Sequence, residues 1–519
     1  MSAGHVDLPA AGTRLRDEIV LSGWATFEDG PLARVEAWLG ETPLGRARLG
    51  LHRPDVAAAH PGADAAVAGF ELRAGLAEGG RDSERQELLR VVATSTGGER
   101  LEFEPLPVVL AATTPARSLP ERGRPQGRSG GGRRILAFTN VLTLGGASIY
   151  LVELLREAQR QGRVEATVVS AVDGPLRGEL EAIGIPVHLL GPIPLDDLDA
   201  YLDRIDELAA WAAGGGFELV FVNTANGLTL PGADVAERLG VPAVWSIHES
   251  FHAALLWDGL APALRDRGEA ALGRADFALF AAEATRRLYS RALADRSATV
   301  PYGLDLAPIE AVREGFDRGA ARHAAGVREG ADLAICVGTV EPRKGQVPLA
   351  QAFELVAGRH PRAEIAFVGS DDGPNSAALA ERIAASPSAG RMRIVPRTAE
   401  VQDWYGMADL LVCASDIESL PKTVLEAMAW ELPVLATGVF GLPELIEPGV
   451  SGWLCEPSDV SALAAGLDAA FGADAAARRR IGAAARDLIL ADHDLGAYAR
   501  LVGDLFDRAA AGEDVSRAF

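Results

Sequence analysis

The chain of 519 residues exceeds one ordinary domain, and its 48% of hydrophobic residues is enough to build several buried cores. Its formal net charge of -22 at pH 7 argues against general binding to nucleic acid or to anionic lipid. No run approaches the roughly 18 apolar residues that cross a bilayer, and the N-terminus lacks the apolar segment of a signal peptide, so we expect a cytoplasmic protein without transmembrane segments.

Residues 1–114 contain the short alternating segments that are typical of antiparallel β structure. The segments EIVLSGWATF, ARVEAWLG and ERLEFEP are separated by turn signals rich in Gly, Asp and Pro. They predict a small all-β, sandwich-like domain with four aromatic residues in its core: Trp24, Trp38, Phe70 and Phe103. A sugar-stacking role for one of the two tryptophans is the alternative.

Residues 115–133, PARSLPERGRPQGRSGGGR, are rich in Pro, Gly and Arg and show no apolar periodicity. This composition predicts a mobile linker between domains. As an alternative, the arginines of this segment, together with Arg134 directly after it, could touch a membrane surface or a polyanionic acceptor. These residues are Arg117, Arg122, Arg124, Arg128, Arg133 and Arg134.

The next segment, ILAFTNVLTLGGASIYLVELLREAQRQG, predicts a strand, a loop at Gly145 and Gly146, and an amphipathic helix. A nucleotide- or sugar-binding βα unit begins in this way, although the loop does not fit the dinucleotide fingerprint. Further along, VPAVWSIHES predicts a strand that ends at His248. A histidine in that place is either structural or part of a site at the carboxyl edge of the sheet.

A basic turn, VGTVEPRKG, follows the apolar strand at residues 333–337. Gly338 lets the backbone approach a ligand closely, and Arg343 and Lys344 bring cationic groups to the same loop. Such a loop suits a diphosphate. The alternative is an exposed basic turn without a ligand.

Glu418 and Glu426 are separated by seven residues in the segment SDIESLPKTVLEAMAW, which follows the apolar strand LLVCAS. The order of strand, loop and helix places Glu418 at the carboxyl end of a strand, where open α/β sheets bind their ligands. Two carboxylates at one helix start suggest a polyhydroxylated ligand. The alternative is an amphipathic helix with two solvated acids.

A glycine-rich loop in ATGVFGLPELI places Gly438 and Gly441 before a predicted helix. The N–H groups at a helix N-terminus can bind an anionic phosphate. The alternative is a simple connection between a strand and a helix.

From about Arg134 to the C-terminus, these motifs in this order resemble the retaining GT-B glycosyltransferases of family 4, the glycosyl transferases group 1, whose hallmark is the E-x7-E element. The resemblance implies an α/β fold with two Rossmann-like domains facing a cleft, preceded here by the small all-β domain. It implies an acceptor domain at residues 134–306 and a nucleotide-sugar domain at 307–482. C-terminal helices at 483–519 can cross back to the acceptor domain.

The resemblance also implies roles for individual residues. Glu418 would act at the reacting sugar, and Arg343 and Lys344 would stabilise the departing diphosphate. His248 would lie near the donor sugar, which completes the candidate catalytic set. The candidate donor-binding residues are Glu426, Gly338, Thr339, Ser419, Leu420, Thr423, Gly438 and Gly441. The first βα loop, with Gly145 and Gly146, would lie near the acceptor and the phosphate.

The chain departs from the family pattern in two places. Thr339 occupies the position of a usual Arg, and Arg343 could supply the guanidinium instead. The segment SLPKT replaces a more glycine-rich stretch between the two acids, and its Pro421 has no N–H to donate. A catalytically silent sugar-binding or scaffold protein and a nucleotide-sugar epimerase are therefore alternative functions.

The implied activity is the transfer of a hexosyl group, with retention, from a nucleoside diphosphate sugar to an acceptor hydroxyl in bacterial glycan, polysaccharide or glycoconjugate synthesis. No metal or other cofactor is expected, and the acceptor is a glycan, a lipid-linked molecule or a small molecule. Peripheral membrane contact is compatible with this activity. The three cysteines, Cys336, Cys413 and Cys455, show no metal spacing and predict buried thiols in a reducing compartment.

Overall fold

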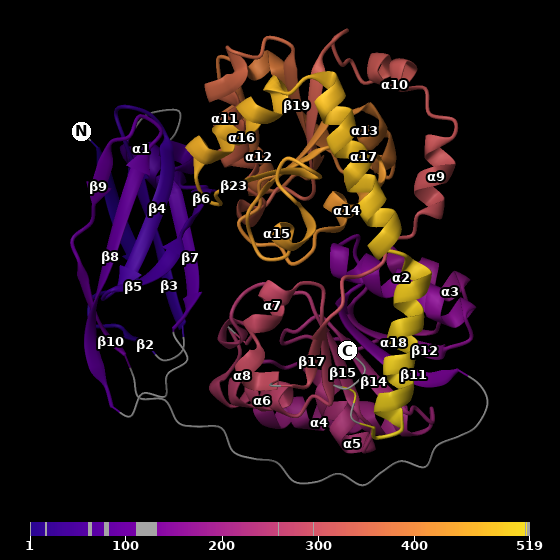
Figure 1. The fold of residues 1–519 in the computed structure, drawn as a ribbon. Helices are drawn as coiled ribbons and strands as arrows, with labels where there is room; N and C mark the ends of the chain where they lie inside the picture. The colour runs from indigo at the N-terminus through magenta and orange to yellow at the C-terminus, as the bar shows by residue number, and fades with distance from the viewer. Residues whose placement is uncertain are drawn as a thin grey trace. The chain divides into compact units, whose positions relative to one another are not determined.

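The computed structural model describes residues 2–15, 18–60, 65–76, 83–110, 132–257, 259–293, 295–513 and 515. The described residues form two compact units, each with its own layers of helix and strand (Figure 1). Unit 1 joins the N-terminal β domain to Leu306–Ala491, and unit 2 joins residues 132–305 to the C-terminal segment that begins at Asp492. The predicted fold class, two Rossmann-like α/β domains preceded by an all-β domain, is confirmed.

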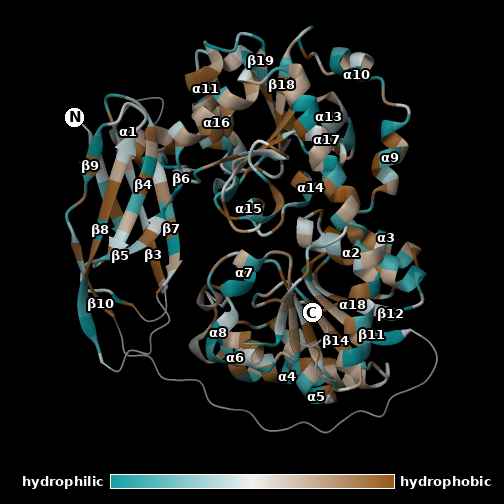
Figure 2. Cartoon of the chain, in the orientation of Figure 1, coloured by the Kyte–Doolittle hydropathy of each residue, from teal (hydrophilic) through white to brown (hydrophobic). Residues whose placement is uncertain are grey.

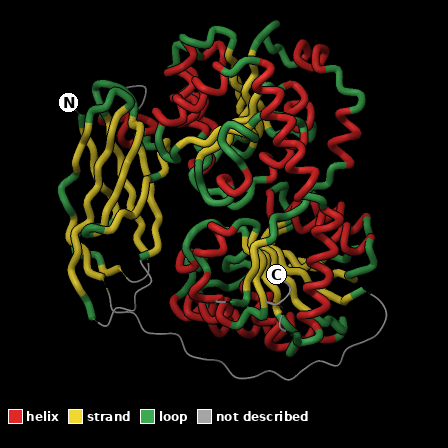
Figure 3. Tube along the Cα trace, in the orientation of Figure 1, coloured by secondary structure: helices red, strands yellow, loops and turns green. Residues whose placement is uncertain are grey.

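The β domain of unit 1 contains two sheets (Figure 3). The first has the order β1 (Ala3–Leu8), β3 (Glu18–Thr26), β7 (Gly69–Gly75) and β6 (Arg48–Leu51). The second has the order β2 (Arg14–Leu15), β10 (Leu106–Leu110), β8 (Arg85–Ser95), β4 (Leu32–Leu39) and β5 (Thr42–Arg46), with β9 (Arg100–Glu102) paired to β8. The strand pairs are antiparallel except β2 with β10, and the helical segments α1 (Pro54–Ala59) and η1 (Ala65–Val67) separate β6 from β7.

Strand alternation decides which aromatic residues enter the core of the β domain. Phe70 is fully buried, and Phe103 packs against it with a ring distance of 5.9 Å. The core prediction is wrong for Trp38, because its neighbours on β4 point inward and leave the indole on the outer face, 5.7 Å from the Arg90 guanidinium carbon. Trp24 also lies outside the main core of the β domain. It packs against a small separate cluster of buried apolar residues and lies 5.1 Å from the ring of His60.

Unit 2 contains a seven-stranded parallel sheet with the order β13 (Val187–Leu189), β12 (Val164–Val172), β11 (Arg133–Val141), β14 (Leu219–Asn223), β15 (Ala243–Ile247), β16 (Phe277–Phe280) and β17 (Ser297–Thr299). Its helical segments are α2 (Gly146–Arg160), α3 (Leu176–Ala182), α4 (Leu198–Ala213), α5 (Leu230–Leu239), η2 (Ala253–Leu255), α6 (Pro262–Gly273), α7 (Glu283–Arg287), α8 (Ser290–Leu293) and α18 (Leu495–Ala510). The central strands β14, β15 and β16 are buried along their whole length and are largely hydrophobic (Figure 2), as expected for a sheet covered on both faces.

The C-terminal helix α18 belongs to the core of unit 2. Its residues Val502 and Phe506 are buried in the same apolar cluster as Leu151 and Leu155 of α2. Burial of one face of each helix is what the hydrophobic effect favours. The chain therefore returns to unit 2 at Asp492.

The predicted linker at residues 115–133 lies largely outside the described residues, as do Arg117, Arg122, Arg124 and Arg128. Arg133 begins strand β11. Its guanidinium forms ion pairs with Asp507 at 2.6 Å and Glu218 at 2.9 Å. Arg134 pairs with Glu165 at 3.2 Å. These two arginines are therefore part of the sheet of unit 2.

The α/β part of unit 1 contains a six-stranded parallel sheet with the order β20 (Met392–Pro396), β19 (Ala363–Ser370), β18 (Asp332–Val337), β21 (Leu410–Cys413), β22 (Val434–Thr437) and β23 (Gly452–Cys455). Its helical segments are α9 (Ala307–Arg313), α10 (Arg318–Ala324), η3 (Pro342–Lys344), α11 (Gln346–Ala357), α12 (Pro374–Ala384), η4 (Ala389–Arg391), α13 (Val401–Met407), α14 (Lys422–Ala429), α15 (Leu442–Leu445), α16 (Val460–Gly472) and α17 (Ala475–Asp492). Because the strands are parallel, their carboxyl ends share one edge of the sheet.

Among the described helices, none is long and apolar enough by itself to span a membrane. Helices α16 and α17 meet that requirement of length and composition only when they are taken together, and they are bent by 108° at their junction.

Candidate active site

The predicted site residues of unit 1 come together because β18, β21 and β22 are neighbours in the sheet. Gly338 follows β18, Glu418 lies after β21, and Gly438 follows β22. Gly345 explains how closely two of these loops approach. Its φ is 68°, and a Cβ on it would lie 2.1 Å from the carbonyl oxygen of Ala414, so only glycine fits there.

Glu418 is the centre of this arrangement. The residue is 8% exposed, and its Oε1 forms an ion pair with Lys344, lies 3.7 Å from Nη1 of Arg343, and accepts a hydrogen bond from Ser415 Oγ at 3.1 Å. Burial alone would raise the pKa of Glu418, but the charges of Lys344 and Arg343 outweigh burial and leave the pKa below its ordinary value. Glu418 is thus an ionised carboxylate in a nearly dry place.

Glu426 lies on the helix of the same segment, about one turn after the start of α14 at Lys422. Its Oε2 accepts a hydrogen bond of 2.9 Å from the hydroxyl of Tyr405. Tyr405 is fully buried on α13, and burial together with the charge of Glu426 raises its pKa well above the ordinary value. The tyrosine therefore stays a hydrogen-bond donor and orients one oxygen of Glu426.

Ser419 and Leu420 are buried between the two glutamates. The carbonyl oxygen of Ser419 accepts a hydrogen bond of 3.0 Å from the N–H of Gly441, while the N–H of Gly438 donates to Cys455 at 2.8 Å. The amides of both glycines are therefore already engaged within the protein. If this loop binds a phosphate, groups other than these two amides must donate to it. The sequence predicts free N–H groups at the start of this helix, and the structure differs in this respect.

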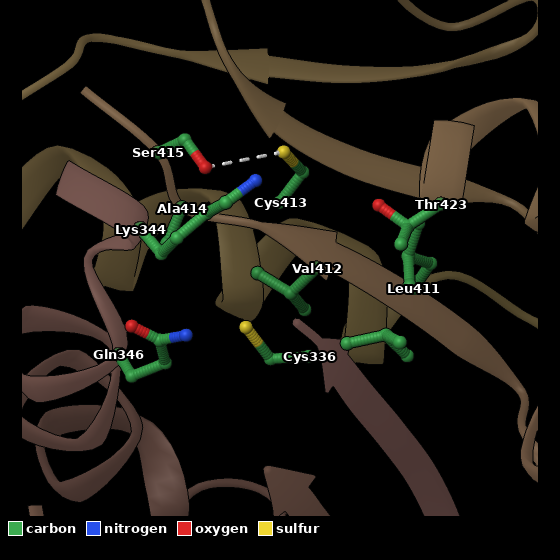
Figure 4. Close-up of a pocket in the computed structure, with 10 residues that line it drawn as sticks. Cys336, Lys344, Gln346, Leu411, Val412, Cys413, Ala414, Ser415 and Thr423 are labelled. Atoms are coloured by element: carbon green, nitrogen blue, oxygen red, sulfur yellow. Dashed lines mark hydrogen bonds between the residues drawn. The ribbon is translucent and has the colours of Figure 1, made fainter. Parts of the chain in front are cut away.

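A small pocket lies beneath the loops and is lined by Lys344, Thr423, Cys336 and Cys413 among others (Figure 4). In this view the ammonium group of Lys344 lies beside the hydrogen bond between Cys413 and Ser415. Burial raises the pKa of Cys336 to about 12 and that of Cys413 to about 11, so both thiols stay protonated. Both are buried free thiols, as predicted, whereas Cys455 is half-buried.

The guanidinium that contacts Thr339 comes from Arg397. Nη2 of Arg397, just after β20, donates a hydrogen bond of 3.1 Å to the hydroxyl of Thr339. Arg343 instead pairs with Glu341 at 2.7 Å and approaches Glu418. Arg397 was not predicted in this role, because it lies 58 positions from Thr339 and the two residues meet only when β20 joins the sheet.

Asp416 connects two loops beside Glu418. Its Oδ1 accepts hydrogen bonds from the N–H of Ser458 at 3.0 Å and from its hydroxyl at 2.7 Å. Its own N–H donates to the carbonyl oxygen of Arg343 at 2.8 Å. Packing around the carboxylate raises the pKa of Asp416 to about 6, although the bonds from Ser458 oppose that rise.

Asp416→Asn is expected to raise the melting temperature above pH 6. Because the folded-state pKa of Asp416 is raised, ionisation of this carboxyl lowers the free energy of unfolding. The loss of stability is complete above about pH 6 and absent below the pKa of the unfolded chain, near 4. Asn keeps an acceptor for Ser458 but carries no charge. Thermal unfolding of both proteins from pH 4 to 8 should show a difference that shrinks as the pH falls. A difference independent of pH would contradict this assignment.

In unit 2, Asn223 connects two of the predicted features by hydrogen bonds. It joins His248 to the loop that contains Gly145 and Gly146. His248 Nε2 lies 2.9 Å from Oδ1 of Asn223, whose Nδ2 donates at 3.0 Å to the carbonyl oxygen of Ala147. A Cβ on either glycine would meet no atom within 4 Å, so this loop borders open space. Asn223 was not predicted, although a polar residue that closes the apolar strand LVFVN was a usable signal.

The tautomer of His248 follows from this network. Because the amide of Asn223 faces Ala147, its oxygen faces the imidazole, and Nε2 of His248 must carry the proton. Burial lowers the pKa of His248 to about 4, so the ring is neutral near pH 7. Its Nδ1 is therefore an acceptor rather than an acid.

Glu249, the next residue, fixes the loop that follows β14. Its carboxylate accepts hydrogen bonds from the hydroxyl of Thr224, from the N–H of Ala225 at 3.0 Å and from the N–H of His248 at 3.1 Å. Burial raises its pKa above the ordinary value. Thr224 has a φ of 71°, a strained conformation for a β-branched residue that the surrounding bonds maintain.

Within the described ranges, no group of three or more His, Cys, Asp and Glu residues is arranged to hold a metal ion.

Two family models match the chain. Residues 317–488 match the glycosyl transferases group 1, and residues 144–308 match glycosyltransferase family 4. The chain is 31% identical over 356 residues to D-inositol 3-phosphate glycosyltransferase 2 of Catenulispora acidiphila, which covers 62% of this chain and 82% of the relative. It is also 31% identical over 351 residues to the D-inositol 3-phosphate glycosyltransferase of Streptomyces scabiei, covering 62% and 77%.

Solved structures share the fold of this chain. HepE of Anabaena, in complex with UDP and glucose, has a TM-score of 0.61 at 20% identity and covers 72% of this chain and 99% of its own. Sucrose-phosphate synthase from Thermosynechococcus elongatus has a TM-score of 0.59 at 20% identity and covers 73% and 100%. At these identities the likeness shows the shared fold alone.

Proposed function

The chain belongs to the glycosyl transferases group 1, and on that basis we propose that it moves a hexosyl group from a nucleoside diphosphate sugar to an acceptor hydroxyl with retention of the anomeric configuration. The observation that supports this proposal is the ionised Glu418 beside Lys344 and Arg343 at the carboxyl edge of the sheet. A carboxylate and two cations side by side match a reaction that develops positive charge on a sugar and negative charge on a diphosphate.

In the proposed reaction, the bond between the anomeric carbon and the diphosphate oxygen breaks, and the acceptor oxygen bonds to the same face of that carbon. The acceptor proton passes to the departing phosphate oxygen. Lys344 and Arg343 stabilise the diphosphate as it leaves, while Glu418 stabilises the oxocarbenium-like sugar. We assign the ribose hydroxyls to Glu426, because the hydroxyl of Tyr405 orients its carboxylate on α14.

The relatives and the shared fold narrow the choice of substrates to test. The named relatives are D-inositol 3-phosphate glycosyltransferases, and the HepE structure contains UDP and glucose. We therefore propose a UDP-hexose as the first donor to test and a polyol or glycan hydroxyl as the acceptor, in bacterial glycan or glycoconjugate synthesis. The two sheets of the β domain, which share one core, support its assignment as a sandwich-like accessory module.

The proposal is tested with the full chain and the glucose conjugates of UDP, GDP, ADP and TDP, each with and without candidate acceptors. Release of nucleoside diphosphate should depend on one preferred donor. The anomeric coupling constant of the product, read by NMR, should report the same anomeric configuration as that of the donor. An inverted product would overturn retention, a converted nucleotide sugar without diphosphate release would indicate an epimerase, and binding without turnover would indicate a scaffold.

His248→Ala is expected to lower turnover by ~10² or more, because one positioned polar group of a site contributes on this scale. The variant also loses the ring contact with Tyr150 at 4.8 Å, so a modest fall in melting temperature should accompany the effect. Steady-state kinetics are normalised to the folded fraction measured by circular dichroism. Normal turnover per folded molecule would show that His248 serves only the core of unit 2.

A further inference from the structure

Strand β6 of the β domain lies against the turn that carries Arg343 and Lys344. Gly50, at a bulge in β6 with a φ of 78°, makes the closest approach. A Cβ on Gly50 would lie 3.0 Å from Cβ of Val347 and 3.3 Å from Cδ of Pro348, at the start of α11. A side chain at position 50 would crowd the helix that begins directly after the Arg343–Gly345 turn, and the φ of 78° would strain any residue other than glycine.

A second contact joins β4 and β5 to the loop before α16. Arg46 Nη1 donates a hydrogen bond of 3.2 Å to the carbonyl oxygen of Pro457, and it lies 3.5 Å from Glu456 and 3.7 Å from Asp459. Arg34 Nη1 lies 3.3 Å from Asp459. The side chain of Asp459 is only 13% exposed and caps α16, so its pairs with Arg34 and Arg46 are better shielded than ordinary surface ion pairs. The side chain of Glu456 is 71% exposed, so its pair with Arg46 is a surface pair.

Both contacts lead to the same turn. The loop that Arg46 holds contains Ser458, which binds Asp416, and Asp416 in turn donates its N–H to the carbonyl oxygen of Arg343. In the first contact, β6 packs directly against α11 and against the Pro342–Lys344 turn. Buried apolar residues of both parts, such as Leu49 and Val347, belong to one continuous cluster.

We propose that the β domain is a structural part of the diphosphate site, and that Arg46 is a positioning residue that holds Arg343 and Lys344 through the Pro457–Asp459 loop. The inference rests on the proposed function, because it takes these two cations as ligands of a nucleoside diphosphate. If the β domain moved independently, substitutions in it would leave the diphosphate site unaffected. Because it is packed against the α/β part of unit 1, we expect the affinity for the donor to depend on β-domain residues that do not contact the donor.

The test compares two charge reversals in the full chain. Arg46→Glu places a negative charge against Glu456 and Asp459, and Arg53→Glu breaks the pairs with Asp7 and Asp55 inside the β domain. The side chains of Arg46 and Arg53 are 22% and 20% exposed, which makes the pair well matched. Titration calorimetry uses UDP, GDP and ADP, and hydrogen exchange follows the amides of residues 340–345.

Arg46→Glu should raise the dissociation constant of the bound nucleotide at least fivefold, lower kcat and accelerate exchange of the 340–345 amides. Arg53→Glu should leave all three at wild-type values, and adding Glu456→Arg to Arg46→Glu should restore part of the affinity. Equal behaviour of the two single variants would overturn the inference. If Arg46→Glu does not fold, Arg46→Ala replaces it with the same expected directions.

The exchange measurement separates this inference from the proposed function. A wild type that binds none of the three nucleotides would refute the proposed function. In that case, faster exchange of the 340–345 amides in Arg46→Glu alone would still support the contact. Unchanged exchange in a folded Arg46→Glu protein would refute the contact whatever the protein binds.

Discussion

Glu418→Gln is expected to lower kcat by ~10² or more while leaving affinity for the free nucleoside diphosphate nearly unchanged. The carboxylate is ionised, because the charges of Lys344 and Arg343 hold its pKa low despite burial. Gln keeps the shape and the acceptor for Ser415 but removes the negative charge that faces the sugar in the transition state. The measurements are steady-state kinetics with the active donor and titration calorimetry with the diphosphate.

The matched comparison for Glu418 is Glu426→Gln. Glu426 is assigned to the ribose, which it contacts equally in the ground state and in the transition state. Its substitution should weaken nucleotide binding by about 1 to 3 kcal/mol, as for a hydrogen bond to a charged group, with a smaller effect on kcat at saturation. If both variants keep wild-type kcat and affinity, the spacing of the two acids is accidental and the proposed mechanism loses its main support.

The parts of the site that sequence analysis predicted are those encoded in short segments. The strand, loop and helix around Glu418 follow from apolar runs and helix periodicity, so Glu418 and Glu426 could be placed at the correct edge of a sheet. Lys344 follows a strand in the same way. The sheet order then brings these loops together. Local pattern does not give the order of the strands, and only the family resemblance implied that these loops share one donor site.

The parts that sequence analysis missed depend on contacts between distant segments. Arg397 reaches Thr339 only because β20 and β18 flank the same strand, and nothing local to Arg397 indicates that neighbour. Docking of the β domain also could not be foreseen, because it depends on a bare glycine at position 50 and on the 425 residues that separate Arg34 from Asp459. The opposite happened at Gly438 and Gly441. The local pattern predicted that their N–H groups would donate to a phosphate, but in the folded chain both donate to carbonyl oxygens of the protein itself.

Lys344→Ala is expected to lower kcat by ~10² or more and to move the acidic limb of the kcat–pH profile to higher pH. Lys344 has two functions in the proposed mechanism: it stabilises the departing diphosphate, and its charge keeps the pKa of Glu418 low. Without the lysine, burial acts on Glu418 with Arg343 as the remaining cation, at 3.7 Å, and the pKa of Glu418 rises. At a mildly acidic pH where the wild-type carboxylate is ionised, the variant carboxylate would be protonated.

The control that isolates the charge is Lys344→Arg, which keeps a cation beside Glu418 and should preserve the position of the acidic limb even if kcat falls. Stability should follow the same sign. A depressed carboxyl pKa contributes stability above the unfolded value, near 4.3, and loses it as the pH falls through the folded value. The melting temperature of Lys344→Ala should therefore lie below that of the wild type at pH 7 and approach it under acid. A loss of kcat with an unmoved acidic limb would show that Lys344 acts on the diphosphate alone and does not control the ionisation of Glu418.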